Sequence, residues 1–97
     1  SIFMPLFVVL DEGRVLDDDL KIKIRTQIRT HASPRHVPNE IYQVEAIPRT
    51  LTGKKMEVPV RRLLLGSPSQ QVAHPDAMAN PDSLAFFVRL AQDLARA

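Results

Sequence analysis

The pattern of apolar and polar positions predicts a strand followed by a helix at the start of the chain. Residues 3–10 form an apolar run rich in β-branched and aromatic side chains, which is typical of a buried strand. Three aspartates at 17–19 then supply the negative charge that favours a helix amino terminus. We expect this helix to end before Pro34. Its expected inner face comprises Leu20, Ile24, Ile28 and His31, with Gln27 as a polar interruption.

A second strand and a short helix are predicted further along, separated by a polar loop over residues 48–55. Residues 41–47 alternate imperfectly between apolar and polar side chains, which favours a strand. A helix is expected over residues 58–65, because Pro59 is tolerated in a first helical turn and Gly66 suits a helix end.

The last third of the chain is predicted to be a mobile loop followed by a helix. Residues 67–79 are polar and irregular, and they form an unusually long connection. Asn80, Pro81 and Asp82 then provide a cap, a first-turn proline and an acidic first turn. The apolar face of the last helix comprises Leu84, Phe87, Val88, Ala91 and Leu94.

These elements predict an α+β fold, with a small sheet of two to three strands packed with helices. Because two strands make a weak sheet, we expect a third strand to precede residue 1. A chain of 97 residues is sized for one domain. Within it we expect a core over 3–66, the mobile loop over 67–81 and the helix over 82–97. A pocket that encloses a nucleotide and an acid commonly lies between domains, so we expect this chain to supply part of a site.

Composition and charge narrow the function classes. The chain is 44% hydrophobic and 25% charged, which is typical of a globular protein. A net charge of +2 and a pI of about 9.4 suit an anionic partner without requiring one. The longest apolar run, residues 2–10, is too short to span a membrane. It also lacks the basic start of a signal peptide, so a cytoplasmic protein is expected.

No metal site is predicted. The chain has no cysteine, which excludes disulfides and thiolate ligands, and its three histidines show no ligand spacing. We expect His31 to be a partly buried structural residue and His36 to hydrogen-bond to the backbone. The aspartates at 17–19 are interpreted as helix-terminal charge, with Mg²⁺ binding as an alternative.

A glycine–lysine pair lies in the loop after the second predicted strand. Alone, Gly53-Lys54 is typical of a solvated turn. A P-loop is excluded, because Pro48 stands where its first glycine belongs and Lys55 stands where a serine or threonine belongs. A lysine on a short loop can nevertheless reach into the active site of another domain, because its ammonium group is carried on a long stem.

Four segments extend this pair into a wider pattern. They are Ser-Pro-Arg-His-Val-Pro at 33–38, Ile-Pro-Arg-Thr-Leu-Thr-Gly-Lys-Lys at 47–55, Glu-Val-Pro-Val-Arg-Arg-Leu-Leu-Leu-Gly at 57–66 and Asn-Pro-Asp at 80–82. Together they resemble the adenylate-forming enzymes, and most closely the acetoacetyl-CoA synthetase branch of the acyl-CoA synthetases. The resemblance covers most of residues 3–96 and corresponds only to the mobile carboxy-terminal domain. The amino-terminal domain, with its ATP-binding loop and acyl pocket, is not covered.

The resemblance implies an ATP-dependent acid–thiol ligase. Acetoacetate, coenzyme A and ATP with Mg²⁺ would give acetoacetyl-CoA, AMP and pyrophosphate, by way of an acyl-adenylate. Lys54 matches the adenylation lysine, whose charge offsets the repulsion between the carboxylate and the α-phosphate. Gly53 would let the loop turn tightly and its backbone approach the nucleotide. After adenylation, the domain of this family rotates, withdraws the lysine and offers another face to coenzyme A.

The resemblance also implies further anion contacts and a modification. Arg25 resembles a helix arginine that contacts the 3′-phosphate of coenzyme A in acetyl-CoA synthetase, with a solvated surface role as the alternative. Arg35 is a second candidate for that phosphate. Lys54 matches a lysine that is acetylated in related synthetases, so a lysine acetyltransferase and a deacetylase are candidate partners. We expect the isolated chain to bind no cofactor and to be inactive without its amino-terminal domain.

Two other functions stay open from the sequence. A free-standing regulatory or interaction domain would share this fold and perform no chemistry. A small basic nucleic-acid-binding module is suggested by the pI and by arginine pairs at 25/29 and 61/62. The net charge of only +2 and the sparse aromatic residues argue against that module.

Overall fold

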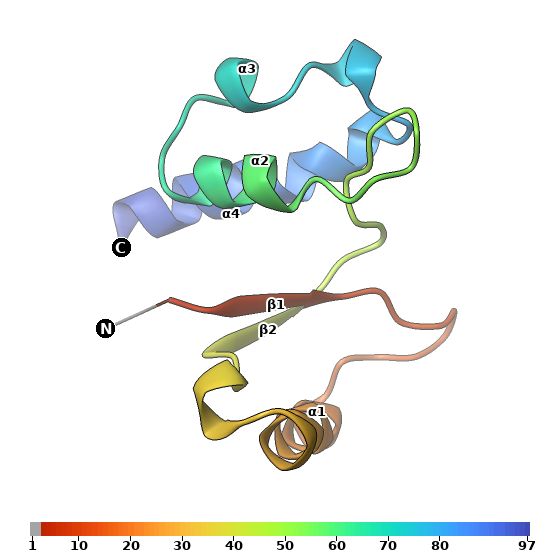
Figure 1. The fold of residues 1–97 in the computed structure, drawn as a ribbon, viewed down its shortest axis with the longest axis vertical. Coiled ribbons are helices and arrows are strands. Elements are labelled where there is room, and N and C mark those ends of the chain that lie inside the picture. The colour runs from red at the N-terminus through yellow and green to blue at the C-terminus, as the bar shows by residue number, and fades with distance from the viewer. Residues whose placement is uncertain (1–2) are drawn as a thin grey trace. The chain divides into compact units, whose positions relative to one another are not determined.

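The chain divides into two compact units. The structure is a computed structural model that describes residues 3–97, so residue 2 of the predicted apolar run lies outside the described part. The first unit is Ser1–Glu45 and the second is Ala46–Ala97. The fold class is α+β, as predicted, because a two-stranded parallel sheet is combined with helices (Figure 1). The single domain and its inner boundaries stay a prediction.

The sheet of the first unit pairs two short strands. β1 (Pro5–Val8) and β2 (Glu40–Gln43) are parallel and run in register from Pro5↔Glu40 to Val8↔Gln43. Proline is tolerated at the first position of a strand, where its missing N–H costs no ladder bond. The rings of Phe7 and Tyr42, which are partners in this register, stack with centroids 5.5 Å apart.

Both strands are shorter than the predicted runs over 3–10 and 41–47. The ladder continues for one further bond, from the N–H of Val44 to the carbonyl of Val8 at 2.9 Å. The first strand then gives way to a turn at Gly13, whose positive φ of 83° redirects the chain. Apolar composition therefore extends further than backbone pairing does, and Phe3 and Val9, which flank the first strand, are exposed.

The helix of the first unit, α1 (Asp18–His31), lies where the aspartates predict it. The Asp17 side chain caps it by accepting a hydrogen bond from the backbone N–H of Leu20 at 2.8 Å. The helix ends before Pro34, as expected. Figure 1 shows α1 on one side of the strands.

The predictions for His31 and His36 are partly wrong. His31 is exposed rather than partly buried, because it lies in the last turn of α1, where a polar or cationic group suits the helix dipole. The His36 ring contacts a side chain, since its Nδ1 lies 2.7 Å from Ser33 Oγ, while the backbone N–H of His36 donates to Ser33 O at 3.0 Å.

The second unit is helical. α2 (Glu57–Leu64) packs against α3 (Ser69–Val72) and α4 (Leu84–Arg96). α2 ends in a Schellman motif, in which Gly66 has a φ of 108° and the N–H of Ser67 donates to Arg62 O at 3.0 Å. The buried residues on the facing helices are Val60, Leu63, Phe87 and Leu90. A further buried cluster contains Met56, Ala73 and Met78, with Val72 and Leu84 packed against it.

The segment over 67–79 is more structured than its composition predicts. It contains α3 and a 3₁₀ turn over Pro75–Ala77, and it buries Ala73 and Met78. Single apolar residues in a polar stretch give no periodic signal, so their burial was not predictable from the local pattern. The predicted mobility of this segment stays a prediction. No helix within residues 3–97 combines the length and apolarity needed to cross a bilayer.

Candidate functional site

The lysine predicted to be catalytic lies on a tight hairpin in the second unit, before α2. Arg49 and Lys55 form an antiparallel bridge at its base. At its tip, the N–H of Gly53 donates to Thr50 O at 2.9 Å, and the N–H of Thr50 donates to Lys54 O at 2.9 Å. Gly53 has a φ of 88°, so this glycine closes a three-residue hairpin loop. The predicted tight turn is therefore present.

Side chains of the hairpin satisfy its own backbone. Arg49 Nη1 donates to Gly53 O at 2.9 Å, and the N–H of Lys54 donates to Thr50 Oγ1 at 3.2 Å. Thr50 Oγ1 lies 3.1 Å from Thr52 Oγ1. These bonds hold the turn from within and leave the ammonium group of Lys54 uninvolved.

The Lys54 side chain is exposed, and its ammonium group has no hydrogen-bond or ion-pair partner among residues 3–97. An ammonium group in this setting can reach an anion that approaches from outside the unit. Lys55 is exposed as well and is the natural comparison for Lys54, because the two differ by one place on the same hairpin.

The hairpin is backed by a segment from beyond α3, residues 77–80 (Figure 1). Two backbone hydrogen bonds join them. They run from Leu51 N–H to Ala77 O at 3.1 Å and from Ala79 N–H to Arg49 O at 3.0 Å, and they make Thr50 and Met78 an antiparallel bridge pair.

The predicted helix-capping role of Asn80 is wrong. Pro81 occupies the first position of a 3₁₀ turn over Pro81–Ser83, as the pattern suggests, but the Asn80 side chain makes no cap bond. It is turned to the hairpin instead, where it contacts the backbone of Ile47 and Arg49. Asparagine is typical both of helix caps and of side chains that bond to the backbone of a distant segment. The sequence alone could therefore not distinguish these two roles for Asn80.

Arg25 and Arg35 lie in the first unit, on α1 and on the 3₁₀ turn Pro34–His36, which contact each other. Arg25 is half-buried and bonds to its own unit, with Nε donating to Pro38 O at 3.4 Å and Nη2 to Asn39 O at 3.1 Å. Its guanidinium keeps further N–H donors, since arginine has five. Arg35 is exposed. These two residues thus belong to one unit, and Gly53 and Lys54 belong to the other.

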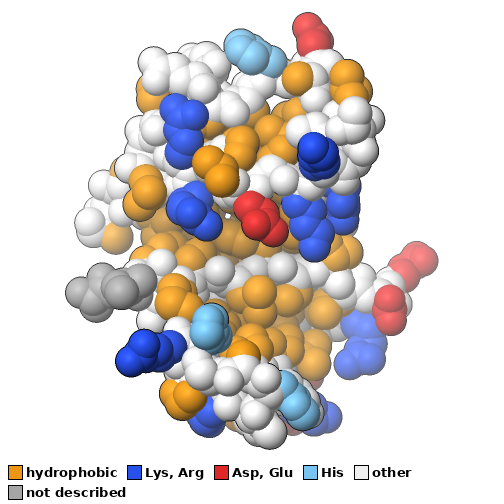
Figure 2. All heavy atoms as spheres, in the orientation of Figure 1, with side chains coloured by type: hydrophobic (Ala, Val, Ile, Leu, Met, Phe, Trp, Pro, Cys, Tyr) orange, Lys and Arg blue, Asp and Glu red, His pale blue; other side chains and the backbone are white. Residues whose placement is uncertain are grey.

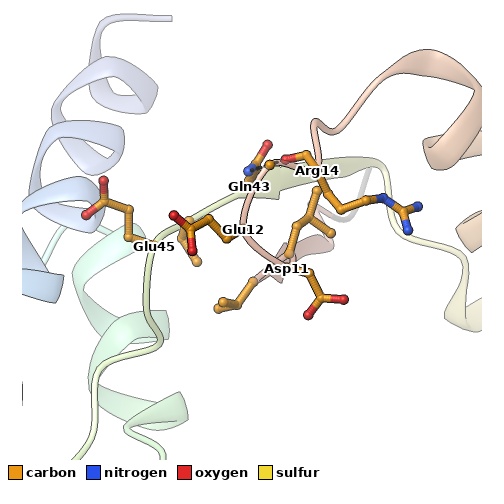
Figure 3. A pocket seen from close by; sticks show the side chains of 9 residues that line it. Asp11, Glu12, Arg14, Gln43 and Glu45 are labelled. Atoms are coloured by element: carbon orange, nitrogen blue, oxygen red, sulfur yellow. Dashed lines mark hydrogen bonds between the residues drawn. The ribbon is translucent and has the colours of Figure 1, made fainter.

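A pocket of about 560 Å³ lies in the first unit, between the turn at 9–14 and residues 43–45 (Figure 3). Its rim carries three carboxylates, from Asp11, Glu12 and Glu45, against the single guanidinium of Arg14. Such a charge balance disfavours a nucleotide phosphate. None of the predicted site residues lines the pocket, and no group of residues within 3–97 could hold a metal ion.

Basic side chains do not gather into one patch on the face drawn in Figure 2. They are interspersed there with hydrophobic and uncharged side chains in both units. A nucleic-acid-binding surface would place several lysines or arginines in a continuous stripe along a backbone of phosphates.

Sequence comparison finds relatives among acetoacetyl-CoA synthetases, although no protein-family model matches the chain. The chain is 45% identical over 85 residues to the acetoacetyl-coenzyme A synthetase of Rhizobium meliloti (strain 1021), which is 88% of this chain and 13% of that enzyme. It is 40% identical over 84 residues to the enzyme of Caenorhabditis elegans, which is 87% of this chain and 12% of that enzyme.

The solved structure of the acetoacetyl-CoA synthetase from Streptomyces lividans agrees with these matches. It covers 98% of this chain with a TM-score of 0.88 and 48% sequence identity, and this chain covers 14% of that one.

Fold and similarity together place the chain among segments of acyl-CoA synthetases. The chain spans only between 12% and 14% of the length of the relatives compared above. Its similarity and its extent are consistent with a carboxy-terminal fragment of an acetoacetyl-CoA synthetase.

Proposed function

We propose that this chain is the carboxy-terminal lid domain of an ATP-dependent ligase that joins acetoacetate to coenzyme A, and that Lys54 is its adenylation lysine. The observation that carries the proposal is the exposed ammonium group of Lys54, unpaired within residues 3–97, on a hairpin whose Arg49 and Thr50 side chains bond to its own backbone. Similarity to acetoacetyl-CoA synthetases over most of the chain supports the reaction class.

The proposed reaction requires a cation during the adenylation step only, so the cation must be able to move in and out of the site. A carboxylate and the α-phosphate of ATP with Mg²⁺ repel each other as they approach, and a lysine held between them lowers that repulsion. A lysine tied to a carboxylate of its own unit would have to break that pair first. Lys54 has no such pair within residues 3–97, so its charge is available to an incoming anion.

The thioester half of the reaction would use other residues of the chain. Arg25 is the candidate for the 3′-phosphate of coenzyme A, through the N–H groups that its bonds to Pro38 O and Asn39 O leave over. Arg35, exposed on the neighbouring 3₁₀ turn, is the second candidate. Lys54 has no task in this half, so its acetylation would stop adenylation and spare thioester formation.

The test is a chimaera in which this chain replaces the corresponding segment of the Streptomyces lividans acetoacetyl-CoA synthetase, to which it is 48% identical. Adenylation is measured by acetoacetate-dependent exchange of pyrophosphate into ATP, and the second half by thioester formation from supplied acyl-adenylate. We expect Lys54→Ala to lower adenylation by about 10²–10³-fold, the usual cost of losing one transition-state partner. Thioester formation should be unchanged.

Lys55→Ala is the matched control, because Lys55 is also exposed and lies on the same hairpin. It should leave both halves within about twofold, as expected for an exposed side chain that touches no reacting group. Equal loss of both halves in Lys54→Ala, or an equal loss in Lys55→Ala, would refute the assignment. The unfused 97-residue chain should release no AMP from ATP and acetoacetate, because the pocket described above carries mostly carboxylates on its rim and disfavours a nucleotide phosphate.

A further inference from the structure

The side chain of Asn80 links two backbone groups on either side of Pro48. Its Nδ2 donates to Ile47 O at 2.8 Å, and its Oδ1 accepts from the N–H of Arg49 at 2.9 Å. Pro48 itself is fully buried, and its carbonyl accepts from the N–H of Met56 at 3.0 Å. Three successive residues are therefore held in place where the chain enters the hairpin.

This link has no substitute among the side chains that the structure describes. Of the side-chain hydrogen bonds of residues 3–97, only those of Asn80 join the first strand of the hairpin to the segment before α4. Asn80 is fixed in turn, because Ser83 Oγ donates to its carbonyl at 2.7 Å. The buried Met78, 4% exposed, anchors the same segment to the core of the second unit.

We propose that Asn80 is a positioning residue for Lys54, an inference that rests on the proposed role of that lysine. The carboxamide helps to fix the direction in which the hairpin leaves the core, and Lys54 lies on that hairpin, next to the Arg49–Lys55 pair at its base. A small tilt at the base therefore moves Lys54, and its ammonium group moves further because it lies at the end of a long side chain. Because a displacement of about 1 Å can cost about 10²-fold in rate, the base of the hairpin affects the chemistry at the ammonium group.

The functional test uses the chimaeric enzyme described above. We expect Asn80→Ala to lower adenylation about tenfold, as a misplaced rather than missing lysine would. The thioester half should stay within about twofold, because Lys54 does not act there. The pair of half-reactions thus separates a positioning role from a general loss of folded enzyme, which would lower both equally.

A second measurement is independent of catalysis. In the 97-residue chain, amide hydrogen exchange followed by NMR reports the N–H of Arg49, which donates to Asn80, and the N–H of Leu51, which donates to Ala77 O. Asn80→Ala should speed exchange at both by about tenfold or more, since local opening sets exchange at exposed turns. The N–H of Val60 inside α2 should exchange as before.

Two comparison variants sharpen the result. Asn80→Asp keeps the oxygen that accepts from Arg49 but sets a carboxylate oxygen against Ile47 O in place of the donor, so Arg49 exchange should be slower than in Asn80→Ala while adenylation still falls. Asn39→Ala is the matched control, because the Asn39 side chain also accepts from a backbone N–H, that of Met4, but in the other unit. It should leave Arg49 exchange and adenylation unchanged.

The inference is overturned if Asn80→Ala changes neither Arg49 exchange nor adenylation, or if it lowers the two half-reactions equally. If instead Lys54→Ala leaves adenylation intact while Asn80→Ala still speeds Arg49 exchange, Asn80 does hold the base of the hairpin but Lys54 is not the adenylation lysine. Failure of the proposed function is thus distinguishable from failure of the Asn80 inference.

Discussion

A single methyl group at position 53 would test how the hairpin backbone supports Lys54. Gly53 has a φ of 88°, and no atom outside its own neighbourhood lies within 4 Å of the place where a Cβ would be. Gly53→Ala therefore meets no steric clash with the rest of the unit. Its cost comes from the backbone conformation alone, because residues with a Cβ rarely adopt positive φ.

The size of the effect follows from that geometry. Left-handed backbone costs a residue with a Cβ roughly 1–2 kcal/mol. Alanine recovers part of this, up to about 1 kcal/mol, because it has fewer conformations to lose from the unfolded chain. We expect a net loss of about 1 kcal/mol in the free energy of unfolding, or a fall in Tm of about 5 °C for a chain of this length.

The assay combines stability with function. Thermal and urea unfolding of the 97-residue chain measure the loss, and Gly13→Ala serves as control, since Gly13 has a φ of 83° and equally open surroundings in the other unit. Both variants should lose a similar free energy of unfolding. Only Gly53→Ala should lower adenylation in the chimaeric enzyme, because only that turn carries the lysine.

One result would refute the backbone explanation. D-alanine at position 53, introduced by chemical synthesis, has the same methyl group but favours positive φ. It should restore stability to at least that of the glycine chain. If D-alanine and L-alanine destabilise equally, an unseen contact rather than the backbone conformation is responsible.

Two further predictions concern the first unit. Burial raises the pKa of the Tyr42 phenol above its usual value of 10.0, and the Glu40 carboxylate raises it further. The folded state therefore holds the phenol proton more tightly than the unfolded state does. This contribution to the free energy of unfolding is fully present below pH 10.0 and is lost as pH rises through the folded pKa. The free energy of unfolding should consequently fall more steeply at alkaline pH in the parent chain than in Tyr42→Phe. Absorbance titration reads this directly, because Tyr42 is the only tyrosine and tryptophan is absent; a midpoint at or below 10.0 would contradict it. Arg25→Lys should raise KM for coenzyme A about tenfold in the thioester half with adenylation unchanged, because lysine cannot present a fork to phosphate. Arg29→Ala, on exposed α1 surface, is its control, and an equal loss in both half-reactions would make Arg25 purely structural.

Local signals were enough to predict the elements whose causes are local. The aspartates at 17–19 predicted the start of α1, because Asp17 caps the helix within three residues. Gly66 predicted the end of α2 for a similar reason, since its positive φ closes a Schellman motif with the turn before it. The tight turn at Gly53 is local too, since it requires a positive φ, but Lys54 itself was singled out only by the family resemblance of the surrounding segments.

Features that depend on distant contacts were missed. Leu90 is buried against the other helices of its unit, although it lies outside the predicted face of α4. Met78 and Ala73 join the core from a segment with no periodic pattern. Asn80 was taken for a cap because asparagine before proline has that local signature, whereas its partners lie 31 and 33 residues earlier in the chain.

The pairing of residues 77–80 with the hairpin bears on where such a domain can be cut. The glycine at 66 ends the matching segment that follows the lysine, so a truncation there would remove none of the residues around Lys54 in sequence. It would remove the groups that accept hydrogen bonds from the N–H of Leu51 and the N–H of Arg49. It would also expose Met56, which is buried in a cluster with Ala73 and Met78. A chain shortened in this way would keep every residue of the 47–55 segment and would still lose the contacts that orient Lys54.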